Sequence, residues 1–199
     1  MKIFLISRRI ICKLTHLQIF KLTYFQNKMI HRVLSSEVDT LLNLARKTFY
    51  DAFAHQNNPD DFEAYTATAF TREALLAEID NPESAFYFAL IDNDPVGYIK
   101  LNYGTAQAEY QDAEGVEVSR LYVHAGHQGK KIGNQLLDFA INKSAEDGLE
   151  YIWLGVWDQN YAAQRFYTRN GFEPVGTHAF VIGTDVQTDI LMKRELVND

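Results

Sequence analysis

The segment Val116–Val123 has the composition of a strand and continues directly into a turn that contains glycine and opens a helix. Such a turn leaves backbone N–H groups without partners at the helix N-terminus, where the helix dipole is positive. Gly129 and Gly133 allow a ligand to approach the backbone closely, and Lys130 and Lys131 add positive charge. The pattern predicts a binding site for a pyrophosphate group, although a plain helix cap would give the same spacing.

Neither of the common nucleotide signatures, G-x-x-x-x-G-K-[ST] and G-x-G-x-x-G, occurs in the chain. The single cysteine, Cys12, excludes an intrachain disulfide, and no cluster of cysteine and histidine has the spacing of a zinc site. We therefore expect no metal. A single cysteine is consistent with a reducing compartment, and we expect a cytoplasmic protein.

The turn resembles motif A of the GNAT superfamily of N-acetyltransferases, whose signature is [QR]-x-x-G-x-[GA]. Gln128 and Gly133 match its first and last positions, whereas Lys131 stands where the middle glycine is expected. The downstream half resembles motif B of the same superfamily in Trp153–Trp157, Asn160, Arg165–Tyr167 and Asn170–Phe172.

This resemblance implies an α/β (α+β) GNAT fold, with a mixed, mostly antiparallel central sheet of about seven strands that is flanked by helices. The two central strands splay apart, and the pantetheine arm of acetyl-CoA enters the gap, where it pairs with Leu121 and Val123. The residues that the resemblance assigns to the cofactor are Leu121, Tyr122, Val123, Gln128, Gly129, Lys130, Lys131, Ile132, Gly133, Asn134, Asn160 and Tyr167.

The reaction needs a base, because an alkylamine with a pKa of about 10.4 is almost fully protonated at pH 7. Glu117 lies on the motif A strand, and a period of two places it on one face with Ser119, Leu121 and Val123. We predict Glu117 as the base and, from the resemblance, Tyr167 as the acid that protonates the leaving thiolate. Transfer would be direct, without a covalent enzyme intermediate.

Each role has a structural alternative. Glu117 could instead pair with Arg120 or a surface lysine, Tyr167 could be a core aromatic residue, and Asn160 could be a helix N-cap.

The acceptor is suggested by charge and by a narrower resemblance. Residues 1–28 contain six basic residues and no acidic one, which leaves 13 basic against 26 acidic residues, a net charge of −13, from Met29 onward. Such a surface repels nucleic acid and attracts cations, although a solvated acidic surface has the same composition. Residues 48–65 and 183–192 resemble PaiA-type spermidine/spermine acetyltransferases.

That resemblance implies a small-molecule amine acceptor, a polyamine such as spermidine or spermine. The alternatives are that the acceptor is another small amine or a protein N-terminus, or that the protein is a non-catalytic acyl-CoA-binding regulatory module. We expect a monomer or homodimer. Residues on the N-terminal helices and the first hairpin that could hold an ammonium group are Asp51, Asp60, Asp61, Glu63, Phe53, Tyr65 and Tyr87.

Hydrophobic periodicity predicts the elements that position these residues, all within one domain at 29–199. Residues 1–28 are predicted to lie outside the fold, and their longest apolar run, Ile3–Ile6, is too short to span a membrane. Strands are expected at 30–33, 86–91, 96–102, 116–123, 151–156, 172–182 and 188–192, and helices at 38–53, 60–70, 71–79, 132–145 and 161–168.

Overall fold

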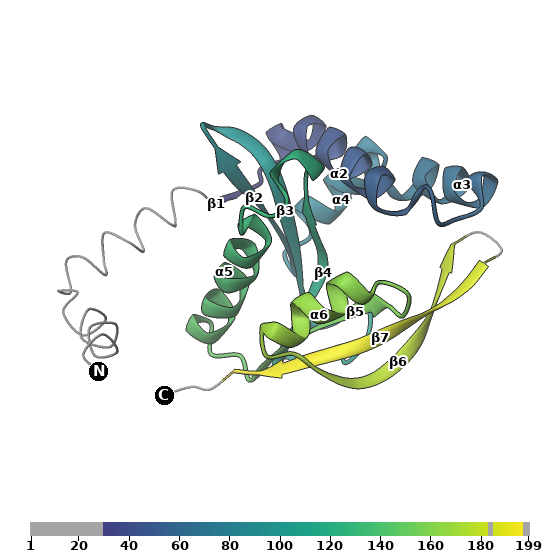
Figure 1. The fold of residues 1–199 in the computed structure, drawn as a ribbon. Helices are drawn as coiled ribbons and strands as arrows, with labels where there is room; N and C mark the ends of the chain where they lie inside the picture. Colours follow the sequence, from purple (N-terminus) through teal and green to yellow (C-terminus); the bar gives the residue numbers. More distant parts are fainter. Residues whose placement is uncertain (1–29, 183–184, 197–199) are drawn as a thin grey trace, which may run out of the picture.

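The computed structural model describes residues 30–182 and 185–196, so the predicted N-terminal extension lies outside the described residues. Seven strands form one open sheet in this part, in the order β1-β2-β3-β4-β5-β7-β6 (Figure 1). The strands are β1 (Ile30–Arg32), β2 (Ser84–Ile91), β3 (Asp94–Tyr103), β4 (Gly115–Val123), β5 (Tyr151–Trp157), β6 (Glu173–Ile182) and β7 (Asp185–Glu195). In the described ranges β4 and β5 pair in parallel and the other neighbours antiparallel, which confirms the predicted mixed sheet.

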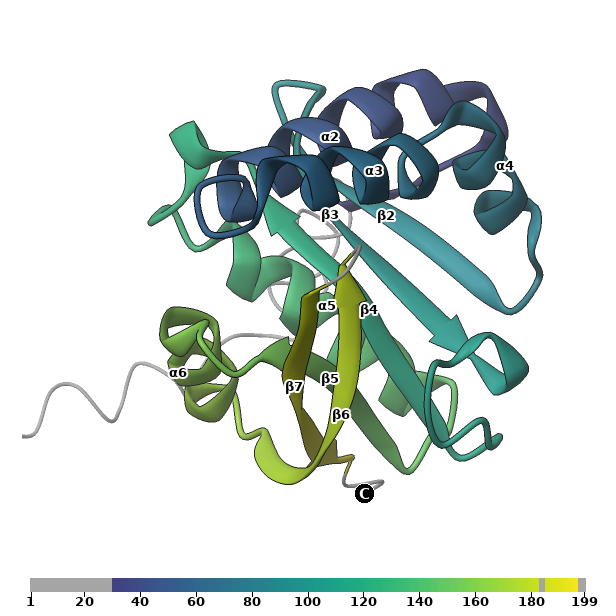
Figure 2. The same ribbon diagram turned by 90° about the vertical axis from the view of Figure 1, so that its right-hand side faces the viewer.

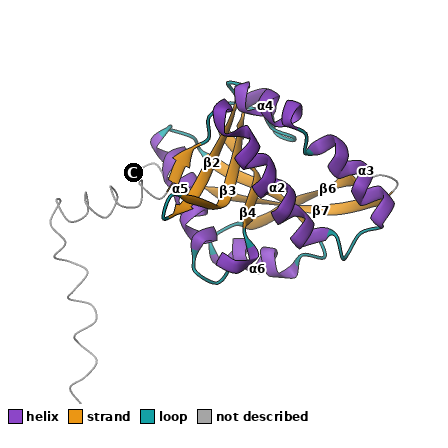
Figure 3. Ribbon diagram, turned by 90° about the horizontal axis from the view of Figure 1, so that it is seen from above, coloured by secondary structure: helices purple, strands orange, loops and turns teal. Residues whose placement is uncertain are grey.

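Five α-helices flank the sheet in the described residues. They are α2 (Val38–Phe53), α3 (Pro59–Ala69), α4 (Arg72–Asp80), α5 (Ile132–Glu146) and α6 (Tyr161–Arg169). The helices α2, α3 and α4 lie together on one side of the molecule, away from α5 and α6 (Figures 2 and 3). The sequence order of strands and helices agrees with the prediction, with small differences at the ends of elements.

Alternating side chains on β2 and β3 produce two hydrophobic cores, one on each face of the sheet. Phe86 and Tyr98 pack with α2 and α4 on one face, which we call the helical-wall face. Tyr87, Ile99 and Leu101 pack with α5 on the other, which we call the α5 face. A ligand between β4 and β5 therefore meets a different set of side chains on each face.

The strands β4 and β5 diverge soon after they meet. Their pairing covers three positions and ends at Glu117 opposite Trp153, whereas β5 continues along β7 as far as Trp157 opposite Asp189. The rest of β4 has β3 on one side and no strand on the other. The predicted splay between the two central strands is confirmed.

Main-chain direction along β4 follows from its antiparallel pairing with β3. His124 N donates to Val96 O over 2.8 Å, and hydrogen-bonded positions alternate along an antiparallel pair. Tyr122 therefore points its main-chain groups at β3, whereas Leu121 and Val123 point theirs towards the open side. An extended ligand could pair with β4 there, as the predicted contacts with Leu121 and Val123 require.

One prediction about β4 is wrong. Its register with β3 shifts by one residue, so that Lys100 is opposite Arg120 but Leu101 is opposite Val118, with Ser119 as the extra residue of a β-bulge. The bulge breaks the period of two. Leu121 and Val123 pack on the α5 face, whereas Glu117 is opposite Asn102 on the helical-wall face.

Candidate active site

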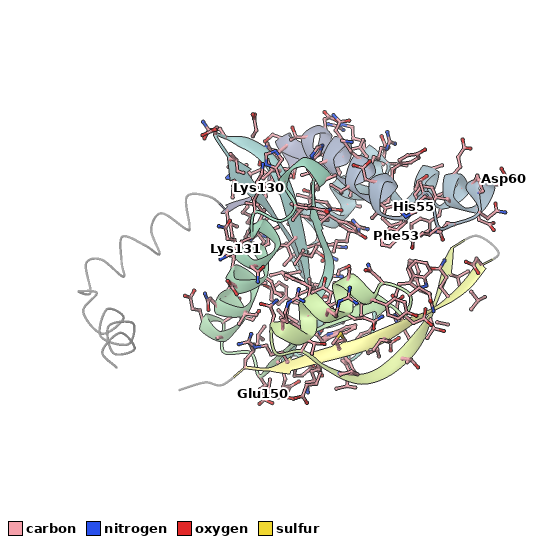
Figure 4. The ribbon with its side chains drawn as sticks, viewed as in Figure 1. Phe53, His55, Asp60, Lys130, Lys131 and Glu150 are labelled. Atoms are coloured by element: carbon pink, nitrogen blue, oxygen red, sulfur yellow. The ribbon has the colours of Figure 1, made fainter. Side chains whose placement is uncertain are left out.

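A cavity of about 340 Å³ opens where β4 and β5 part. Its lining includes Glu117 of β4, Tyr167 of α6 and Asp189 of β7, together with the aromatic rings of Phe53 and Trp157. Figure 4 shows Phe53 on the side of α2 that faces the β6–β7 hairpin. The cavity thus brings together side chains from elements that are far apart in the sequence.

Glu117 is buried, with 7% of its surface exposed. Its Oε2 accepts hydrogen bonds from Asn102 Nδ2 (3.1 Å) and from the backbone N–H of Ala108 (3.0 Å), and Ser84 Oγ donates to Asn102 Oδ1 (2.9 Å). No hydrogen bond within the described residues involves Oε1, which is available to a ligand or a water. This carboxylate is therefore fixed in orientation and lines the cavity.

The alternative ion pair between Glu117 and Arg120 does not form. The guanidinium of Arg120 instead makes a two-pronged contact with Glu78, at 2.7 and 3.0 Å. Glu78 also contacts Lys100 Nζ at 3.2 Å. Burial, together with the charge of Arg120, lowers the pKa of Lys100, and Glu78 opposes that shift. These two cations are thus largely satisfied by one carboxylate.

Tyr167 lies in the core on the α5 face and yet also lines the cavity. Tyr167 can pack in the core and still reach the cavity because β4 and β5 are no longer paired beyond Glu117 and Trp153. Burial raises the pKa of Tyr167 to about 12, so its hydroxyl keeps its proton at neutral pH. The phenol can therefore donate a hydrogen bond or a proton to a group in the gap, on the opposite side from Glu117.

The turn before α5 has the predicted open amides. Gln135 N donates to Lys131 O, whereas the N–H groups of residues 129–134 have no acceptor within the described part of the chain. Gln128 ties the turn to β4, since its Nε2 donates to Val123 O over 3.2 Å. Gly133 faces Phe166 and Leu121, and a side chain there would narrow the gap. Lys130 and Lys131 are exposed beside the turn (Figure 4).

The departure of Lys131 from the motif has a visible structural consequence. Its φ is 65°, in the left-handed region that favours glycine. Lys131 therefore has a backbone conformation that glycine, the residue expected at this position of the motif, adopts readily.

We expect Lys131→Gly to stabilise the protein by about 1 kcal/mol, because glycine adopts this conformation without the steric cost that a side chain incurs. That gain corresponds to a rise in Tm of roughly 2–4 °C for a chain of this size, measurable by thermal unfolding. Lys130→Gly, at an adjacent residue outside the left-handed region, is the matched control and should not stabilise. Equal effects of the two variants would contradict the explanation.

Asn160 has the N-cap role that was the structural alternative for it, and it also lies at the cavity. Its side chain accepts a hydrogen bond from Ala163 N (3.1 Å) and so caps α6. It also lines the cavity beside Tyr167.

The structure separates the candidates for holding an ammonium group. Phe53 and Tyr65 line the cavity. Asp51 and Glu63 line a different groove, on the outer side of α2 and α3. Tyr87 packs against Phe139 on the α5 face. Asp60 and Asp61 lie in the first turn of α3. Figure 4 places Asp60 at the outer edge of the molecule.

The sequence analysis missed several cavity residues. Asp189 and His178 come from β7 and β6, where they are opposite each other. Each is a single polar residue on an alternating strand, a pattern that also fits a solvated face. Only the sheet order, which puts β7 next to β5, brings them to the site.

Neither a metal centre nor a membrane-spanning helix is found within the described ranges. No three histidine, cysteine, aspartate or glutamate residues gather there in a way that could hold a metal ion. No helix among the described residues is long and apolar enough to cross a membrane.

Comparisons with known proteins agree with this geometry. The model of the acetyltransferase (GNAT) family matches residues 38–172. A Lactobacillus delbrueckii subsp. lactis protein, named as an uncharacterized N-acetyltransferase in the pepI 3′ region, is 36% identical over 168 residues, which cover 84% of this chain and 97% of that protein. The aminoalkylphosphonate N-acetyltransferase of Salmonella typhimurium is 29% identical over 117 residues, 58% of this chain and 70% of that protein.

The solved structures that resemble this chain include the PaiA N-acetyltransferase of Thermoplasma acidophilum in complex with coenzyme A. It has a TM-score of 0.69 and 26% identity, and the match covers 83% of this chain and 97% of that one. The ribosomal-protein-S18-alanine N-acetyltransferase of Escherichia coli, with a TM-score of 0.63 and 12% identity over 84% of this chain and 92% of that one, shares the fold. The chain therefore belongs to the acetyltransferase (GNAT) family and is a GNAT-family N-acetyltransferase.

Proposed function

We propose that this protein transfers the acetyl group of acetyl-CoA to a primary amine of a polyamine such as spermidine or spermine. The observation that supports this most directly is the open gap between β4 and β5, with a protonated phenol on one side and a fixed carboxylate on the other. A thioester in that gap would have its sulfur near Tyr167 and its carbonyl carbon accessible from the Glu117 side.

The proposed position of acetyl-CoA is set by main-chain groups that have no partner among the described residues of the protein. The pantetheine arm would pair with Leu121 and Val123, and the pyrophosphate would accept hydrogen bonds from the amides at 129–134. Asn160 would bind a pantetheine amide. The Thermoplasma structure, solved with coenzyme A, supports the same cosubstrate here.

The chemical step is a direct displacement. The amine nitrogen attacks the thioester carbonyl, a C–N bond forms and the C–S bond breaks. Glu117 accepts the proton that the amine loses, directly or through a water, and Tyr167 donates its proton to the departing thiolate. A backbone N–H of β4 near Leu121 would stabilise the developing oxyanion.

Charge in the cavity favours a polycationic acceptor. Glu117 has no lysine or arginine within ion-pair distance in the described residues, and the only such contact of Asp189 is with His178. Both carboxylates therefore remain for ligand cations. An anionic acceptor, such as an aminoalkylphosphonate, would need a free cation, but Arg120 is already held by Glu78 at both ends.

Acetyl-CoA-dependent thiol release by the purified full chain tests this function. We expect turnover with spermidine and spermine that exceeds turnover with amino acids, peptides and an aminoglycoside. Activity confined to a peptide or an aminoglycoside would reject the polyamine acceptor, and acetyl-CoA binding in calorimetry without turnover on any amine would favour the non-catalytic module.

A further inference from the structure

Asp189 is a partly desolvated carboxylate whose charge is incompletely satisfied. Its side chain is 16% exposed and lines the cavity. The nearest basic side-chain atom that the structure assigns to it is Nε2 of His178 at 3.6 Å, longer than a hydrogen bond. Burial raises the pKa of Asp189, and His178 opposes the shift. A carboxylate in such a position gains stability when a cationic ligand reaches it.

The surroundings keep this carboxylate in the cavity. His178 Nδ1 lies 3.0 Å from Glu109 Oε1, which fixes the imidazole ring next to Asp189. Both side chains lie over Gly155 of β5, where a Cβ would come within 3.3 Å of Asp189 Oδ2 and 3.5 Å of His178 Nε2. The absence of a side chain at Gly155 makes room for the pair.

Aromatic rings from four elements surround the same end of the cavity. Phe53 of α2 contacts Trp157 of β5 with ring centroids 6.4 Å apart, and Tyr65 of α3 contacts Phe180 of β6 at 6.0 Å. All four residues line the cavity. Aromatic faces next to a carboxylate are the chemistry that recognises an alkylammonium group.

This end of the cavity is distant from the proposed reaction centre. Glu117 is opposite Trp153, and Asp189 is opposite Trp157, four residues further along β5. At the rise of a strand, the two positions are about 13 Å apart along β5. An extended polyamine could approach both, whereas a short diamine could not.

Building on the proposed acetylation of polyamines, we propose that Asp189, positioned by His178, binds a second ammonium group of the acceptor and thereby selects long polycations over monoamines. Asp189 is then a specificity-determining residue at the end of the cavity opposite Glu117. The reacting nitrogen remains at the Glu117 end.

Steady-state kinetics of Asp189→Asn with paired acceptors test the proposal. The first pair compares spermidine with an alkylmonoamine of the same length. The second pair compares a short α,ω-diamine with a long one. We expect kcat/KM for spermidine and the long diamine to fall about tenfold or more, the discrimination that one charged hydrogen bond provides. The loss should appear in KM, while kcat/KM for the monoamine changes less than about twofold. Glu195→Gln, which removes one charge from an exposed position on the same strand, should change neither.

Three outcomes would overturn the proposal. They are an equal loss for spermidine and monoamine, an unchanged spermidine KM, or a wild-type enzyme that shows no preference for the long diamine over the monoamine. Thermal unfolding of Asp189→Asn, expected to match or exceed the wild-type Tm because a desolvated charge is removed, separates loss of binding from loss of folding.

Calorimetry with spermidine and the coenzyme A-bound protein distinguishes this proposal from the proposed function. Weaker binding to Asp189→Asn supports the subsite even if no amine is acetylated, whereas equal binding to both proteins refutes it. Acetylation of other amines together with an absence of spermidine binding would reject both the polyamine acceptor and the subsite.

Discussion

Replacing Tyr167 by phenylalanine is expected to lower kcat about 10²- to 10³-fold, within the range that general acid catalysis contributes. The hydroxyl is buried at the gap, and its pKa of about 12 keeps it protonated at every pH up to about 11. Phenylalanine preserves the ring contacts with Phe166 and Phe172. Binding of acetyl-CoA, measured by calorimetry, should therefore persist while single-turnover acetyl transfer slows.

The matched control is Tyr161→Phe, which removes a hydroxyl from the exposed N-terminal residue of the same helix. It should leave kcat within about twofold of the wild-type value. If Tyr167→Phe also retained wild-type kcat, Tyr167 would be a core residue only, and the acid would have to be water or another group.

Replacing Glu117 by glutamine is expected to lower kcat/KM about 10²-fold or more at pH 7, because the base that accepts the amine proton is lost. Folding should be preserved. Both hydrogen bonds to Glu117 end on one oxygen, and the glutamine carbonyl can accept them from Asn102 and Ala108.

The pH dependence of this variant distinguishes a base from a structural residue. Without an enzymic base, the rate follows the fraction of neutral amine, which increases about tenfold per pH unit below a pKa of about 10.4. The ratio of wild-type kcat/KM to that of Glu117→Gln should thus decrease steadily between pH 7 and pH 10. A ratio that stays constant over this range would argue against the role of base. The control is Glu114→Gln, at an exposed position just before β4, whose kcat/KM should equal the wild-type value at every pH.

Most of the fold was predictable because its elements have strong local signals. The buried stripe of α2, with Val38, Leu41, Ala45 and Phe49, follows helical periodicity. The turn before α5 was also predictable, since its open amides depend on local backbone geometry rather than on distant contacts. Lys131, where the motif has glycine, adopts the left-handed conformation within this turn.

The face on which Glu117 lies was not predictable from β4 alone. A period of two holds only while both strands advance together, and the bulge at Ser119 depends on the register with β3. Without it, Glu117 would share a face with Leu121. With it, Glu117 faces the helical wall and Tyr167 remains on the α5 side, so the proposed base and the proposed acid approach the gap from opposite faces.

The sequence by itself determined the family, the order of elements and the positions of the turn, Tyr167 and Asn160, because each depends on residues close together in the chain. Tertiary structure alone decided which acidic residues meet in the cavity. Asp51 and Glu63 point to an outer groove, whereas Asp189 reaches the site because β7 lies beside β5 and Gly155 leaves space for it. Such long-range neighbours are fixed by strand order and register, which no local pattern encodes.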